Sequence, residues 1–161
     1  MRRRRAAALT AALLSGALAA TACTPPESVV AGSTWQVTGL WDATGSPGVL
    51  PDDAAGRARL FFGEATMVGS TGCSPLQGAV TFTREGEPAR AESADLLRID
   101  RVEFEEAGEG CVGRSRHVHD SLQEILSEGT TFDVRHDSNA KLVLTERTAL
   151  VDSPAIHLSA L

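Results

Sequence analysis

His117, His119 and Asp120 lie within four consecutive positions, and imidazole and carboxylate groups this close together can ligate a metal ion. In a helix, however, His117 and His119 lie about 200° apart and cannot hold one ion, whereas helical zinc sites place histidines at i and i+4. An extended segment could present both, but no second cluster completes a site. We therefore expect no metal, and we interpret these residues as polar groups near a helix start, where Asp120 is favourable.

Acidic side chains at Glu103, Glu105, Glu106 and Glu109 could act in hydrolysis or bind calcium. They lack the alternating Asp, Asn and Gly positions of a calcium loop, and glutamates spaced by two on a strand line a solvated face. Serine, histidine and aspartate also occur in the chain, but no Gly-x-Ser-x-Gly elbow positions a nucleophile. The sequence therefore predicts no catalytic residues and no cofactor.

Three glycines, Gly69, Gly72 and Gly78, surround Cys73 but do not follow the spacing of a phosphate-binding loop. We interpret them as turn residues around a buried cysteine.

Cys23 follows a segment that is typical of an export signal. Residues 2–5 are all arginine, and the apolar run at residues 6–20 is too short to span a bilayer. The sequence Ala20-Thr21-Ala22-Cys23 resembles a lipobox, after which a bacterial lipoprotein is cut and its cysteine receives acyl chains, including palmitate. A lipobox usually has leucine where this chain has Ala20. The alternatives are a secretory signal cleaved near Ala22, an uncleaved anchor and a twin-arginine signal.

The lipobox resemblance implies a signal peptide at residues 1–22 and a lipidated tether at residues 23–31. Pro25, Pro26 and few large side chains suit a short tether. The protein would then be held on the cell membrane through its N-terminal lipid, on the extracytoplasmic face.

Removal of residues 1–22 leaves 139 of the 161 residues, which is enough for one domain with a single core. Of the 15 basic side chains 11 remain against 21 acidic ones, so the net charge changes from −6 to −10. Binding of phosphates needs a basic surface, and we therefore expect no nucleic-acid partner.

Cys73 and Cys111 are the cysteines that remain once Cys23 carries lipid. An even pair in an exported domain predicts a disulfide bond, which would restrict the unfolded chain by about 4 kcal/mol in the loop-entropy model. The alternative is two free thiols, one of them reactive, but no histidine stands at a spacing that identifies a basic partner.

Short runs with β character make up most of the chain after the tether, separated by segments rich in Gly, Pro and Asp. Residues 97, 99, 102 and 104 are apolar and alternate with polar ones, with a change of phase near Asp100 that predicts a bulge. Residues 136–140 supply a predicted turn. The predicted strands are residues 33–41, 58–62, 66–69, 78–83, 96–104, 131–135 and 142–145.

One amphipathic helix is predicted over residues 115–128, because Val118, Leu122, Ile125 and Leu126 recur at i, i+4, i+7 and i+8. Ser115 would be its N-cap and Gly129 would end it. A single helix among many strands predicts an α+β domain, in which the helix covers an antiparallel sheet or plugs a partly closed barrel.

The order of several segments resembles that of META domains, the small HslJ-like domains of bacterial envelope lipoproteins. The matching segments are residues 32–37, residues 69–78 with Gly72, Cys73 and Gly78, Cys111 before the helix, and residues 132–134 and 142–144. This chain has Ser74 where family members have Asn, and it lacks the Thr and Met that precede their second cysteine. The chain is therefore similar to a divergent member.

The resemblance implies one META-like domain at residues 32–147, with an antiparallel sheet curled into a partly closed barrel around the helix. It implies no catalytic residues and only a loose link with envelope stress. Residues 148–161 form a C-terminal tail that could add an edge strand, pack on the barrel or bind a partner.

The expected function is non-enzymatic binding or structural support in the cell envelope, with an unidentified envelope protein as partner. We expect Trp35 in the core and Trp41, which precedes a long loop, to be more exposed. The alternative is a carrier that encloses a small apolar ligand inside the curled sheet. A cavity lined by Leu60, Phe62, Val80 and Phe82 would favour the carrier, and a filled core with an exposed aromatic patch would favour a protein partner.

Overall fold

The computed structural model describes residues 30–41, 47–50 and 54–161. Within them the chain forms one α-helix, one 3-10 turn and ten strands. The elements are β1 (Thr34–Trp41), β2 (Pro47–Val49), β3 (Arg59–Phe62), β4 (Thr66–Ser70), β5 (Pro75–Arg84), β6 (Glu87–Pro88), η1 (Ala91–Ser93), β7 (Leu96–Phe104), α1 (Gly113–Ile125), β8 (Thr131–Ser138), β9 (Lys141–Glu146) and β10 (Ala155–Ala160). The predicted single α+β domain with an antiparallel sheet is confirmed.

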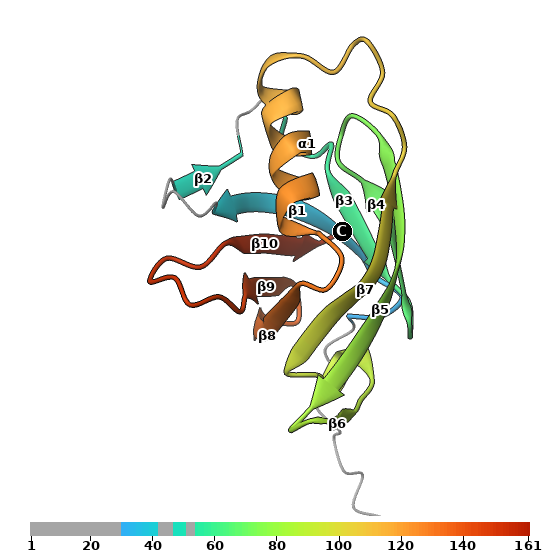
Figure 1. Cartoon of the computed structure of the whole chain (residues 1–161), viewed down its shortest axis with the longest axis vertical. Coiled ribbons are helices and arrows are strands. Elements are labelled where there is room, and N and C mark those ends of the chain that lie inside the picture. The colour runs from blue at the N-terminus through green and yellow to red at the C-terminus, as the bar shows by residue number, and fades with distance from the viewer. Residues whose placement is uncertain (1–29, 42–46, 51–53) are drawn as a thin grey trace, which may run out of the picture.

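Eight strands close into an antiparallel barrel, in the order β1-β3-β4-β5-β7-β8-β9-β10 and back to β1 (Figure 1). The closing contact is the pairing of β10 with β1, from Trp35 opposite Ala160 to Trp41 opposite Ala155. The barrel is therefore closed and not partly closed as predicted, because the C-terminal tail supplies β10, the strand that joins β9 to β1. β10 also pairs with β9, so it is not an edge strand.

A single hydrophobic core fills the interior and includes the apolar face of α1. Trp35 is 1% exposed, as expected from its strand phase, and its indole N–H donates to the carbonyl of Val30 at 3.0 Å. Phe62 and Phe82 meet edge to face with ring centroids 6.3 Å apart. Val30 itself is 1% exposed, so the folded part of the chain already includes this residue of the expected tether.

Helix α1 follows the predicted apolar stripe but starts earlier than expected. Val118, Leu122, Ile125 and Leu126 are all buried. The expected N-cap, Ser115, is wrong: the N-cap residue is Val112, without a side-chain cap, and Ser115 lies inside the helix. Gly113 has a φ of +60°, a conformation open to glycine, which lets the chain turn into the helix two residues before Ser115.

The predicted bulge at Asp100 is present in β7. Ile99 pairs with Val80 and Arg101 pairs with the adjacent Ala79, which leaves Asp100 as the extra residue. The predicted turn at residues 136–140 is shorter than expected, because β8 continues to Ser138 and pairs there with Lys141.

Gly69 and Gly78 lie inside β4 and β5, so their interpretation as turn residues was wrong. A Cβ at Gly78 would meet the carbonyl oxygen of Arg101 at 2.4 Å, and one at Gly69 would meet the carbonyl oxygen of Arg59 at 2.2 Å. Both glycines allow a neighbouring strand to approach closely. Gly72 alone is in the turn, with a φ of +90°.

Substitution of Gly78 by alanine is expected to lower the free energy of unfolding by about 2–3 kcal/mol, because the new methyl group must push β7 away from β5. Gly110→Ala is the matched control, since a Cβ there meets nothing within 4 Å. Urea unfolding of both variants measures the difference. Equal stability of the two would contradict the close approach of β5 and β7.

Candidate functional site

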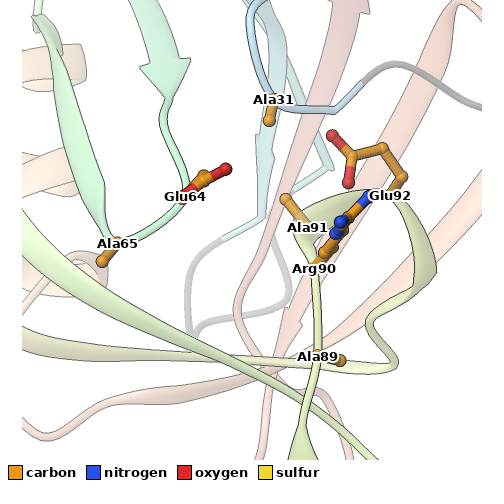
Figure 2. A pocket seen from close by; sticks show the side chains of 7 residues that line it. All are labelled: Ala31, Glu64, Ala65, Ala89, Arg90, Ala91 and Glu92. Atoms are coloured by element: carbon orange, nitrogen blue, oxygen red, sulfur yellow. The ribbon is translucent and has the colours of Figure 1, made fainter.

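A cavity of about 810 Å³ opens at the end of the barrel where the chain enters β1 (Figure 2). Four of the lining residues are alanines with small side chains, namely Ala31, Ala65, Ala89 and Ala91. Glu64 stands on one wall, and Arg90 and Glu92 stand on the other. Among the described residues that line it, the cavity offers one guanidinium and two carboxylates, and none is a nucleophile beside a base.

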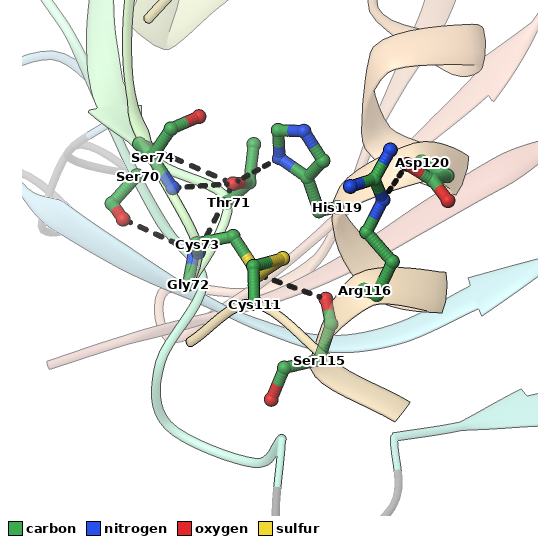
Figure 3. The surroundings of a disulfide bond; sticks show 10 residues. All are labelled: Ser70, Thr71, Gly72, Cys73, Ser74, Cys111, Ser115, Arg116, His119 and Asp120. Atoms are coloured by element: carbon green, nitrogen blue, oxygen red, sulfur yellow. Dashed lines mark hydrogen bonds and ion pairs between the residues drawn. A yellow bond between two sulfur atoms is a disulfide. The ribbon is translucent and has the colours of Figure 1, made fainter. Parts of the chain in front are cut away.

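Cys73 and Cys111 form a disulfide bond that joins the β4–β5 connection to the segment before α1 (Figure 3). Their Cα atoms are 5.3 Å apart, at a sequence separation of 38. The Sγ atom of Cys73 lies 3.4 Å from the carbonyl oxygen of Ser115 in the first turn of α1. Both cysteines are half-buried, which corrects the expectation that Cys73 is buried. Cys23 and the predicted signal peptide lie outside the described residues.

Thr71 organises the turn that carries Cys73. Its Oγ1 accepts the backbone N–H groups of Cys73 at 3.2 Å and Ser74 at 3.1 Å, and it lies 2.7 Å from His119 Nδ1 on α1. Oγ1 also lies 3.2 Å from the carbonyl oxygen of Ser74, so the tautomer of His119 decides which group takes the hydroxyl proton. It goes to His119 Nδ1 if that nitrogen is unprotonated, and to the carbonyl oxygen of Ser74 if Nδ1 carries a proton. The histidine thus connects the helix to the disulfide turn, next to the covalent bond.

The His117, His119 and Asp120 cluster does not form a site. His119 is 3% exposed and faces the core, whereas His117 is exposed. Asp120 pairs with Arg116, one turn earlier on α1, at 2.8 Å. Among the described residues no three His, Cys, Asp or Glu side chains come together in a way that could hold a metal ion.

The glutamates at positions 103, 105, 106 and 109 are all exposed, in agreement with a solvated face. Glu103 accepts a hydrogen bond from Gln77 at 3.3 Å and lies 3.8 Å from Arg101. The first is a surface contact between β5 and β7 and the second a surface contact along β7, and neither indicates a site.

A groove crosses the outer face of β8, β9, β10 and β1, and its centre is an aromatic pair. Trp41 and His157 have ring centroids 3.9 Å apart with planes tilted by 34°. Gly39 lies opposite His157 in the register, and a Cβ there would be 2.6 Å from the indole ring. The missing side chain of Gly39 therefore makes room for Trp41 against the sheet.

This Trp41 groove consists of two adjoining clefts of about 310 Å³ and 280 Å³ that share Val143 and His157. Trp41 is half-buried and more exposed than Trp35, as expected. The charged and polar residues that line the clefts include Thr38, Arg135, Asp137, Lys141, Thr145, Asp152 and Ser153. Sequence reasoning missed the groove because its residues come from four strands; the one local signal was a glycine two residues before a tryptophan.

His136 lies on the same side of β8 as the buried Phe132, and within the described residues neither ring nitrogen has a hydrogen-bond partner. Burial lowers the pKa of His136 below its ordinary value of 6.5. The unfolded chain then binds a proton more readily than the folded one. The contribution of His136 to the free energy of unfolding is thus expected to be complete above about pH 6.5. It should fall as the pH drops from there towards the lower pKa that His136 has in the folded state.

A His136→Phe variant is expected to flatten this dependence between about pH 7.5 and pH 5. Some pH dependence of the free energy of unfolding should remain in this variant, because burial also lowers the pKa of His157. The urea midpoints of both proteins, measured across this pH range, test the expectation. If the midpoint changes with pH as steeply in the variant as in the wild type, the role of His136 is contradicted.

Comparisons with known proteins identify a fold and no family. No family model matches the chain, and no curated protein matches it. An NMR structure of a protein from Burkholderia xenovorans is similar, with 14% sequence identity and a TM-score of 0.55 over 95% of this chain and 99% of that chain. The chain is thus a small antiparallel β-barrel with one helix. The part of the chain described by the structure has no helix that is long and apolar enough to cross a membrane.

Proposed function

We propose that the protein is an exported META-like domain that is lipid-anchored at Cys23 and acts by binding or structural support in the cell envelope. The observation that carries the proposal is the Cys73–Cys111 disulfide. Disulfides persist in oxidising compartments and are rare in the cytosol, so a bond built into the turn and the helix start favours export.

The position of Val30 supports a short tether. Val30 is buried beside Trp35, so at most six residues lie between Cys23 and the folded chain, and six residues span at most about 20 Å when fully extended. The barrel end that holds Val30 and the Figure 2 cavity would then lie against the membrane.

The packing of the core favours a binding role on the outer surface over the role of a carrier with an internal ligand. Leu60, Phe62, Val80 and Phe82, the residues that a ligand cavity would need, are at most 3% exposed and pack in the common core. The Trp41 groove instead offers a partly exposed aromatic ring on the outside.

Intact mass of the native protein extracted from membranes tests the proposal, with and without reduction and alkylation. The expected mass is that of residues 23–161 plus acyl chains, with two cysteines alkylated only after reduction. An unlipidated mass with Cys73 and Cys111 alkylated before reduction would overturn both the anchor and the exported state.

A further inference from the structure

We propose that the Trp41 groove binds a neutral saccharide chain. A sugar ring has an apolar face that packs against an aromatic ring, and a rim of hydroxyl groups that need hydrogen-bond donors and acceptors. The groove combines these features, because Trp41 lines one cleft beside the polar side chains of Thr145, Asp152 and Ser153. This proposal deepens the binding role proposed above and rests on it.

The charges of the groove favour a neutral ligand. Among the described lining residues, two cations, Arg135 and Lys141, are balanced by two carboxylates, Asp137 and Asp152. Arg135 and Asp137 also lie 3.3 Å apart and neutralise each other. A phosphate or another strong anion would require an excess of basic groups, and a cation would require an excess of carboxylates.

The aromatic pair is held in place before any ligand arrives. Trp41 packs over Gly39 and against His157, and these residues lie on β1 and β10, the two strands that close the barrel. At Trp41, β1 pairs with β10 on one side and with β2 on the other, and β10 also pairs with β9, so the ring sits on a rigid surface. A preformed contact surface reduces the entropy lost on binding.

The dimensions of the groove suit several sugar units. The two clefts of about 310 Å³ and 280 Å³ adjoin at His157, which makes an elongated site in the range of small-ligand pockets. Val151, which is 100% exposed, lines the first cleft and can cover a second apolar ring face. A deep apolar pocket, as an acyl chain would need, is not formed by these residues.

Titration of the full-length protein in detergent with tetra-N-acetylchitotetraose, a neutral tetrasaccharide, tests the inference by NMR. The chain has two tryptophans, and the indole N–H of Trp35 is bonded to Val30 in the core. We expect the Trp41 indole signal to shift and saturate with a Kd on the order of 1 mM while the Trp35 signal stays. The amide signals of Val143 and Thr145 should shift with the Trp41 signal.

Trp41→Ala should weaken the response of these amides by about tenfold or more, as expected for a central aromatic contact. Val68→Ala is the matched control, since Val68 is 45% exposed on β4, outside the groove, and should leave binding unchanged. If Trp41→Ala does not fold, the wild-type titration decides alone.

Absence of any shift at Trp41, Val143 and Thr145 would overturn the inference. A response to a neutral pentapeptide without one to the tetrasaccharide would overturn it in favour of a protein partner. Neither result depends on lipidation, which the mass measurement tests separately.

Discussion

Replacement of Cys73 by serine is expected to lower the free energy of unfolding by about 4 kcal/mol, a large share of the stability of a small domain. The disulfide closes a loop with a sequence separation of 38, which contains all of β5, β6 and β7. Without the bond, the unfolded chain gains the freedom of that loop. Urea unfolding of the oxidised wild type and the variant measures the difference.

Cys111→Ser should cost the same as Cys73→Ser, and the double variant should cost no more than either one, because each change removes the same bond. Wild-type protein in reductant should unfold like the variants. Unfolding of Cys73→Ser at the urea concentration of the oxidised wild type would contradict a stabilising disulfide.

The contact between Thr71 and His119 is a second link between α1 and the β4–β5 turn, beside the disulfide. His119 is buried and bonded to Thr71 within the same turn that holds Cys73. This hydrogen bond continues to join α1 to the β4–β5 turn after reduction. We therefore expect reduction to weaken the domain without releasing the helix from the native state.

The sequence predicted the elements whose apolar pattern is local. The stripe of α1 and the bulge at Asp100 could be read from spacing alone, because each depends on side chains within about ten residues of one another. The helix start could not be read in this way. It depends on the backbone of Gly113 and on the covalent position of Cys111, whereas Ser115 only has the side chain of a good N-cap.

The face that Trp41 occupies could not be predicted by simple alternation. Trp35 and Val37 point into the core, and strict alternation would place Gly39 and Trp41 there as well. A register shift between Val37 and Gly39 reverses the phase, so that Leu40 points inward and Trp41 outward. The bulge therefore creates the aromatic surface of the groove, and it depends on pairing with β10, more than a hundred residues away.

The pairing partners of the C-terminal tail were also beyond sequence reasoning. Ile156 and Leu158 alternate with polar residues as in a strand, but nothing local identifies β1 as their neighbour. The last matched segment of the META-like pattern, residues 142–144, ends before β10, so the resemblance predicts a domain without the tail. In the structure Ile156 and Leu158 of the tail belong to the common core.

Substitution of Ile156 by aspartate is expected to abolish folding or to lower the free energy of unfolding by at least about 4 kcal/mol. Ile156 is 0% exposed and pairs with Leu40 and Leu144 in the two strands beside it. A carboxylate there would be buried without a partner, and loss of β10 would leave β1 and β9 as open edges.

Leu161→Asp is the matched control, because Leu161 lies in the same tail but is 67% exposed just beyond β10. It should change stability by about 0.5 kcal/mol at most. Limited proteolysis and circular dichroism of both variants distinguish the two expectations even when Ile156→Asp is unfolded. If Ile156→Asp were as resistant to protease as Leu161→Asp, β10 would not be needed to close the barrel. The rigid support inferred for the Trp41 groove, which crosses β10, would then be contradicted as well.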